Sequence, residues 1–172
     1  AIHDADGWTY YTDFSLWDTY RTLHPLMNLI DPERQADFVR SLLTMGEQGG
    51  HLPRWPLGTG YTGGMVGDPA HIVISGALLR GIGDVDPTVA LEQMLDTAAQ
   101  RGRWAEWEQQ GWLSVDGGGG SVAKTLEFAW ADHATANLAE LIDDPRAPAI
   151  RARSEGWRNL FDDATGFLRP RA

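Results

Sequence analysis

Apolar residues recur at helical spacing along most of the chain, and proline and glycine mark where the helical segments begin and end. The first expected helix runs from Ser15, its N-cap, to about His24. Pro25 should kink or end this helix, because proline removes a backbone hydrogen bond, and the pattern resumes from Leu26 to Ile30.

Three Asp-Pro pairs start further helices, because aspartate is a favoured N-cap and proline is favoured at the first helical position. We expect these helices over residues 31–49, 68–79 and 86–98. A short aromatic helix should lie within 103–112, Ser121 should cap a long helix after the glycine turn 117–120, and Pro148 should open a last helix that ends near Leu160-Phe161.

Strand-like alternation is confined to residues 8–11, so the sequence predicts an all-α fold. Leaving aside the short aromatic segment, the helices sort into consecutive hairpins (first with second, third with fourth, fifth with sixth) separated by long loops. That rhythm indicates an α/α barrel or a helical solenoid, and these helical hairpins would form about half of an (α/α)6 barrel. No short repeat favours a TPR-like or HEAT-like array.

One connection, HLPRWPLGTGYTGGMVG at residues 51–67, is too long and too irregular for a simple link between helices. It is rich in glycine and proline, yet its apolar side chains are too numerous for a solvated, disordered segment. Long ordered loops of this kind usually carry function.

Composition narrows the function without identifying it. The chain has 172 residues and a formal net charge of −10, which disfavours nucleic acid and a polybasic membrane anchor as partners. It has no cysteine, no apolar run long enough for a membrane span, and no signal peptide pattern at its start. Eight tryptophans beside a single lysine suit either an aromatic core or aromatic platforms for neutral hydroxylated ligands such as sugars.

Common catalytic motifs are missing, and the scattered histidines disfavour a metal site. Candidate chemistry begins at Trp17, Asp18 and Arg21. Asp18 and Arg21 can form an ion pair on one helix face. Alternatively, Asp18 accepts hydrogen bonds from sugar hydroxyls and Trp17 is a platform, while Leu16, Tyr20 and Leu23 pack inward.

A second set of candidates lies in or beside the long loop: His51, Arg54, Trp55, Tyr61 and Asp68. Glycines let the backbone approach a ligand closely, and arginine with aspartate supplies donors and acceptors. The alternative makes Trp55 a loop anchor and Asp68 a helix cap.

The long helix after residue 120 carries two further polar pairs. Lys124 and Glu127 are three residues apart and predict a surface ion pair. Asp132 and His133 follow an apolar run, and they would matter for function only if both faced a cavity.

Separated segments of the chain together resemble glycoside hydrolase family 92, the calcium-dependent exo-acting α-mannosidases. They are FSLWDTYRTLHPL, HLPRWPL, YTGGMVGDPA, SVAKTLEFAWAD and WRNLFDDATGFLRPR, in the family's order. The resemblance implies a β-sandwich domain followed by an (α/α)6 barrel with the active site between them. Residues 1–172 would be part of the barrel domain, without the β-sandwich and the second half of the barrel.

The resemblance also implies how the functional residues are distributed. Trp17 and Asp18 match the wall of the terminal mannose pocket, and Arg54, Trp55 and Asp68 belong to segments that match the loop beside it. The family often has cysteine where Gly64 stands, which indicates a small residue there. The catalytic acid, the base and the ligands of the Ca²⁺ cofactor are expected C-terminal to this chain, so the chain alone should be inactive.

The resemblance further implies a mannose-containing glycan as substrate, the remaining domains of the same polypeptide as partners, and a secreted, cell-surface or periplasmic location. Alternatives are a mannosyl-phospho-mannose hydrolase of the same family, another helical-barrel glycosidase of the trehalase or glucoamylase kind, and a non-catalytic sugar-binding helical module. The other glycosidases would need a carboxylate pair within these residues, and none is compelling.

Overall fold

The structure is a computed structural model that describes residues 4–172. The α-helices are α1 (Leu16–Thr19), α2 (Leu23–Ile30), α3 (Pro32–Gly49), α4 (Pro69–Leu78), α5 (Pro87–Ala99), α6 (Trp104–Gln110), α7 (Ser121–Leu141) and α8 (Ala147–Ser154). Short 3-10 turns span Val115–Gly117 and Gly156–Leu160. The strands form two antiparallel hairpins of two-residue strands, β1 (Pro56–Leu57) with β2 (Gly60–Tyr61) and β3 (Phe161–Asp162) with β4 (Phe167–Leu168). The predicted all-α class is confirmed.

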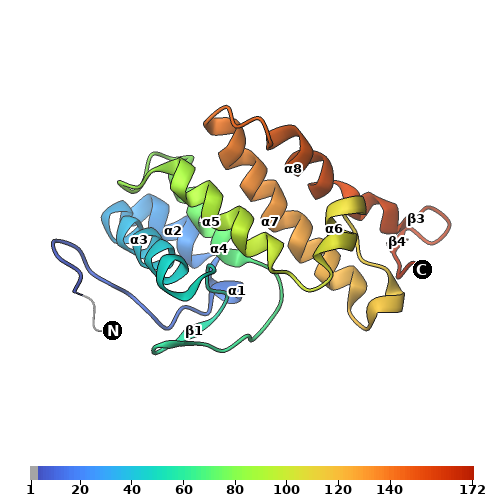
Figure 1. The fold of residues 1–172 in the computed structure, drawn as a ribbon, viewed down its shortest axis with the longest axis horizontal. Coiled ribbons are helices and arrows are strands. Elements are labelled where there is room, and N and C mark those ends of the chain that lie inside the picture. Colours follow the sequence, from blue (N-terminus) through green and yellow to red (C-terminus); the bar gives the residue numbers. More distant parts are fainter. Residues whose placement is uncertain (1–3) are drawn as a thin grey trace.

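Helix α7 is the element around which the others are arranged. It packs most extensively against α8 and then against α4, and α5 also contacts it. Figure 1 shows α5, α7 and α8 side by side, with α2 and α3 near the N-terminal end and the β3–β4 hairpin near the C-terminal end. A large apolar cluster joins α3, α4, α5 and α8, and a smaller one surrounds Trp107.

Local start and stop signals were predicted well. The Asp31 carboxylate accepts a hydrogen bond from the Arg34 backbone N–H at 3.2 Å, and that of Asp86 accepts one from Thr88 at 2.8 Å. Helix α3 ends at Gly50, whose φ of +83° is a left-handed conformation that glycine adopts without steric cost. The predicted pairings of α2 with α3 and of α7 with α8 are confirmed, but α4 packs more extensively on α7 than on α5.

The predicted first helix was wrong at its break. The chain leaves helical geometry at residues 20–22, before Pro25, and α2 begins at Leu23. Pro25 is therefore in the first turn of α2, where its missing N–H would have had no partner inside the helix. Ser15 precedes α1 but makes no capping hydrogen bond through its side chain, and Leu23 is 41% exposed and does not pack inward.

Other boundaries also differ from the prediction. Gly120 occupies the cap position of α7 with a φ of +77°, so Ser121 is the first helical residue and not the cap. Residues 8–11 form no strand. Helix α8 ends at Ser154, and the chain reaches Leu160 through a 3-10 turn because glycine follows at position 156.

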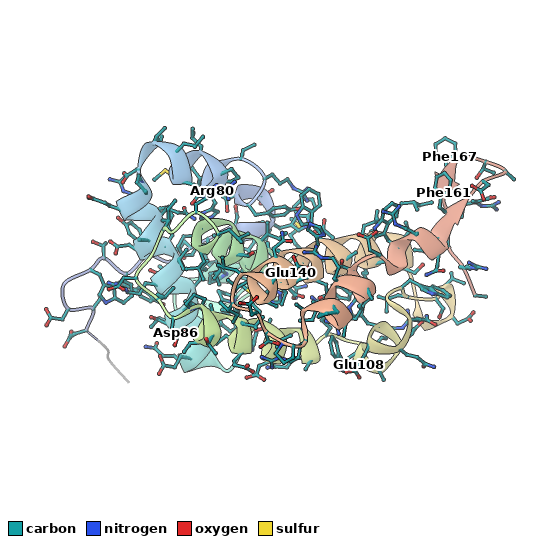
Figure 2. The ribbon with its side chains drawn as sticks, turned by 90° about the horizontal axis from the view of Figure 1, so that it is seen from above. Arg80, Asp86, Glu108, Glu140, Phe161 and Phe167 are labelled. Atoms are coloured by element: carbon teal, nitrogen blue, oxygen red, sulfur yellow. The ribbon has the colours of Figure 1, made fainter. Side chains whose placement is uncertain are left out.

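Large apolar side chains are exposed on several elements, and two of them are the most exposed among the described residues. Leu29 on α2 is 79% exposed, and Phe167 on the β3–β4 hairpin is 72% exposed. Figure 2 shows Phe161 and Phe167 together on this hairpin, which projects from the body of the molecule. Among the described residues, no helix is long and apolar enough to cross a membrane.

The contact between the end of α6 and the turn after α8 depends on two glycines. A Cβ at Gly156 would lie 2.6 Å from the Gly111 Cα, a distance that backbone cannot accommodate without moving. We expect Gly156→Ala to lower the stability of the protein by about 1–3 kcal/mol, measured as a lower midpoint of thermal unfolding. Gly119→Ala is the matched control, because no heavy atom lies within 4 Å of its Cβ position. Equal midpoints for the two variants would contradict the close contact.

Candidate functional site

The long loop and the end of α5 enclose a cavity of about 330 Å³, which we call the loop pocket. All the loop candidates from the sequence line it together: His51, Arg54, Trp55, Tyr61 and Asp68. Arg101 and Phe128, which lie outside the loop, also line this pocket.

Tyr61 anchors the loop against the end of α3. Its hydroxyl lies 2.7 Å from the Met45 carbonyl oxygen and 2.9 Å from that of His51, and burial raises the pKa of Tyr61 to about 12. Gly49 leaves room for this ring, since a Cβ there would lie 2.5 Å from the hydroxyl oxygen. A Cβ at Gly64 would come within 3.3 Å of the Trp55 ring, so the site of Gly64 accepts only a small residue.

A buried charge network adjoins the loop pocket, and two of its members, Asp68 and Arg101, line the pocket. The Arg101 guanidinium donates through Nε to Asp68 at 2.6 Å and through Nη1 to Asp132 at 2.7 Å. Asp132 also accepts hydrogen bonds from the Trp107 indole N–H at 2.9 Å and from Arg153. Two cations and two carboxylates therefore balance one another in charge where little water reaches them, although the buried Nη2 atoms of Arg101 and Arg153 have no hydrogen-bond partner among the described residues.

The network sets the protonation of its members. Burial alone would raise the pKa of Asp132, but Arg101 and Arg153 hold that pKa below its usual value. Burial would likewise lower the pKa of Arg101, but Asp132 and Asp68 raise it. Both groups therefore stay charged at neutral pH.

Asp68 is not the side-chain cap that the sequence suggested as an alternative. It precedes α4, yet its carboxylate makes no capping hydrogen bond and binds Arg101 instead. Arg101 was missed, because it lies 33 positions away along the chain and nothing in its own sequence context marks it. Arg54 and Trp55 both line the loop pocket, and their role in binding a sugar stays a prediction.

Trp17 and Asp18 lie outside the lining of the loop pocket, on α1. The Trp17 indole donates to Glu127 Oε1 on α7 at 3.1 Å, and the Asp18 side chain is exposed. The predicted pair between Asp18 and Arg21 is wrong: Arg21 pairs with Glu127 at 3.3 Å and lies over the Trp17 ring.

In neither of the two polar pairs expected on α7 do the two residues act together. Glu127 binds Trp17 and Arg21, while Lys124 is exposed, so the predicted Lys124–Glu127 pair is wrong. Asp132 is buried in the charge network, but its neighbour His133 is exposed beside Arg151, since adjacent helical residues face different directions. Asp132 and His133 therefore do not form one site.

Glu127 links Trp17 on α1, a residue expected to form the wall of a sugar pocket, with the end of the long loop. A Cβ at Gly67 would lie 2.9 Å from the Glu127 Cβ, so the loop backbone rests directly on this side chain. Phe128, the next residue along α7, lines the loop pocket. The structure therefore places the wall and the loop pocket beside the same turn of α7.

Within residues 4–172, no three or more histidine, aspartate or glutamate side chains are grouped so that they could hold a metal ion. The residues described here thus do not fit a Ca²⁺ site, and the carboxylates of the charge network are already matched by arginines.

Comparison with known proteins identifies the relatives of the chain. The sequence profile of the glycosyl hydrolase family 92 catalytic domain matches residues 1–172. The family GH92 α-mannosidase BT3965 from Bacteroides thetaiotaomicron, in complex with mannoimidazole, matches with a TM-score of 0.93 and 32% identity, covering 99% of this chain and 23% of its own. The family GH92 inverting mannosidase BT2199 from Bacteroides thetaiotaomicron VPI-5482 matches with a TM-score of 0.87 and 28% identity, over 94% of this chain and 23% of its own. A search of curated proteins finds no match.

These matches confirm that the helical hairpins form part of an (α/α)6 barrel of the expected kind. The chain spans less than a quarter of the length of these two solved structures.

Removal of the Arg101 guanidinium should be severely destabilising. Arg101→Met leaves buried carboxylates without their cation, and we expect a loss of about 3–5 kcal/mol in the free energy of unfolding. The control is Arg146→Met, which removes the surface pairs of Arg146 with Glu92 and Asp144 and should cost about 1 kcal/mol. Chemical denaturation measures both, and similar losses would contradict the structural role of Arg101.

The buried His71 predicts a dependence of stability on acid. The hydroxyl of Thr135 donates to the Ala131 carbonyl, so His71 Nδ1 must be the donor in its 3.1 Å contact with Thr135. Burial lowers the pKa of His71 from 6.5 to about 4. Between pH 6.5 and 4, the unfolded chain therefore binds a proton at His71 that the folded protein does not bind. The contribution of neutral His71 to the free energy of unfolding is fully present above pH 6.5 and is lost as pH falls toward 4.

Between pH 6.5 and pH 4, the free energy of unfolding should fall by about 3 kcal/mol because of His71. In His71→Asn, the free energy of unfolding should fall less steeply with decreasing pH. Urea unfolding at stepped pH measures it. The buried His24, whose pKa burial also lowers, contributes a decline of the same sign, so His71→Asn should reduce the slope without abolishing it. An unchanged slope in His71→Asn would contradict the assignment.

Proposed function

Because the chain belongs to glycosyl hydrolase family 92, we propose that it is part of the catalytic barrel of an inverting, exo-acting α-mannosidase that hydrolyses terminal α-mannosides of glycans. The observation that carries this proposal is the match of 99% of the chain, at a TM-score of 0.93, to a solved α-mannosidase bound to mannoimidazole. The second relative, described as an inverting mannosidase, supports the stereochemical part.

The proposal extends to the organisation of the complete protein. A β-sandwich would precede this segment, and the second half of the barrel would follow it. The exposed apolar side chains support this arrangement, because rows such as Leu26, Leu29 and Ile30 on α2 are usually covered in a folded protein. We place the complete enzyme outside the cytoplasm, on the cell surface, in the periplasm or in the medium.

Within this scheme, the chain supplies substrate binding and not the catalytic pair. The exposed Asp18 carboxylate accepts hydrogen bonds from mannose hydroxyls, and Trp17 shapes the wall of the pocket. Arg54, Trp55 and Asp68 support the neighbouring loop. Hydrogen bonds to a charged acceptor are worth about 1.5–3 kcal/mol, enough for Asp18 to decide affinity.

The chemistry would be carried by residues elsewhere in the complete protein. In an inverting glycosidase, an acid protonates the leaving oxygen while a base activates water on the other face of the sugar, the two carboxyl groups lying about 6.5–9.5 Å apart. The Ca²⁺ that the family resemblance implies would also be held there.

The first test is hydrolysis of 4-nitrophenyl α-mannoside by the complete polypeptide and by residues 1–172 alone. We expect activity that EDTA removes in the complete protein and none in the shorter chain. Activity in the shorter chain would contradict the proposal, because an acid and a base would then lie within it.

Substitution of Asp18 in the complete polypeptide tests the proposed role of Trp17 and Asp18 in binding mannose. Asp18→Ala should lower kcat/KM at least about tenfold, whereas Asp96→Ala, another exposed aspartate, should leave it unchanged. A complete protein that binds mannose without hydrolysing any mannoside or mannosyl phosphodiester would instead indicate a sugar-binding module.

A further inference from the structure

Two side chains hold Trp17 in place: Glu127 on α7 and Arg21 in the turn after α1. Glu127 Oε1 accepts a hydrogen bond from the Trp17 indole at 3.1 Å and from Arg21 Nη2 at 3.3 Å. Arg21 in turn donates through Nε to the Trp17 carbonyl oxygen at 3.1 Å, and its guanidinium lies 4.5 Å from the centre of the Trp17 ring. We call Trp17, Arg21 and Glu127 the tryptophan clamp.

The tryptophan clamp stabilises helix α1, which is too short to be stable alone. Helix α1 is only four residues long, and the chain leaves helical geometry directly after it. So short a helix is unstable without tertiary contacts, so the orientation of Trp17 and of the adjacent Asp18 depends on what holds α1. Glu127 belongs to the long helix α7 and is only 17% exposed, so it is the rigid member of the clamp.

Glu127 also sets the distance between the wall and the loop. The backbone at Gly67, with a φ of +83°, rests against the Glu127 side chain, and any Cβ there would collide with it. One carboxylate thus contacts α1 on one side and the residue before Asp68 on the other.

We propose that Glu127 is a positioning residue for substrate: through the indole N–H of Trp17 it fixes the Trp17–Asp18 wall relative to the loop segment at Gly67–Asp68. This inference rests on the proposed function for the identity of the ligand, but its geometry stands on the contacts above. Glu127 acts through Trp17 and need not touch the sugar.

The experiment compares Glu127→Ala and Glu127→Gln in the complete polypeptide, with 4-nitrophenyl α-mannoside for kinetics and D-mannose for calorimetry. Glu127→Ala should raise KM about tenfold and leave kcat within about twofold, because lost positioning weakens ground-state and transition-state binding alike. Glu127→Gln should recover most of the affinity, because its amide oxygen still accepts the indole N–H.

Glu140→Ala is the matched control. Glu140 also lies on α7 and pairs with an arginine, Arg151, at 2.9 Å, but it is on the last turn of the helix (Figure 2). Its loss should leave KM unchanged. All variants should keep the unfolding midpoint of the parent within a few degrees, and Glu127→Gln keeps the test valid if Glu127→Ala does not fold.

Coupling to Trp17 distinguishes positioning from a general structural role. Trp17→Phe removes the indole N–H, so Glu127→Ala should have little further effect on KM in that background. Fully additive effects in the double variant would overturn the inference, as would a parental KM in Glu127→Ala.

Failure of the proposed function would look different. A parent without hydrolysis of the mannoside overturns that function, and calorimetry with D-mannose then decides the inference alone. Weaker binding in Glu127→Ala than in Glu140→Ala would support the clamp, whereas equal binding, or no binding by the parent, would overturn it.

Discussion

The contact on which the rest of this structure depends is the buried guanidinium of Arg101 between Asp68 and Asp132. A charge removed from water is tolerated only when partners replace its hydration, and here every partner comes from a different part of the chain. Asp68 precedes α4, Arg101 follows α5 and Asp132 lies in the middle of α7. These elements cannot separate without leaving a carboxylate or a guanidinium unpaired in a medium of low dielectric.

That constraint explains how an irregular, glycine-rich loop can form a defined pocket. The loop begins where the Leu52 N–H donates to the Thr97 hydroxyl at 2.8 Å, and it ends at Asp68 on the charge network. Tyr61 holds its middle against α3. Both ends are therefore fixed on α5 or on the segment directly after it, and the glycines between them allow the backbone its turns.

Features that depend on neighbours along the chain, such as three helix starts, were predicted correctly from the sequence. Side-chain pairings that depend on a residue far away in the sequence were not. Three Asp-Pro pairs correctly placed three helix starts, because capping and proline preference are local. The same dipeptide nevertheless has different side-chain roles: Asp31 and Asp86 cap their helices, while Asp68 binds Arg101. The resemblance to a family predicted that the long loop lies beside a sugar pocket, and only the fold shows that Arg101 lines the loop pocket. Boundaries near Pro25 and Ser121 failed by a few residues, since a helix can begin before a proline or after a left-handed glycine.

Partners that are distant in sequence also determine which contacts the polar residues around Trp17 and Asp18 make. Spacing along each helix predicts Asp18 with Arg21 and Glu127 with Lys124, and such exposed pairs are worth only about 0.2–0.5 kcal/mol. The half-buried indole of Trp17 needs an acceptor, and leaving its N–H unsatisfied would cost about 1–3 kcal/mol. Glu127 meets that need and attracts Arg21 across the helix interface. The stronger cross-helix arrangement therefore leaves Asp18 as an exposed carboxylate that Arg21 does not neutralise, and this is the carboxylate for which we propose sugar hydroxyls as ligands.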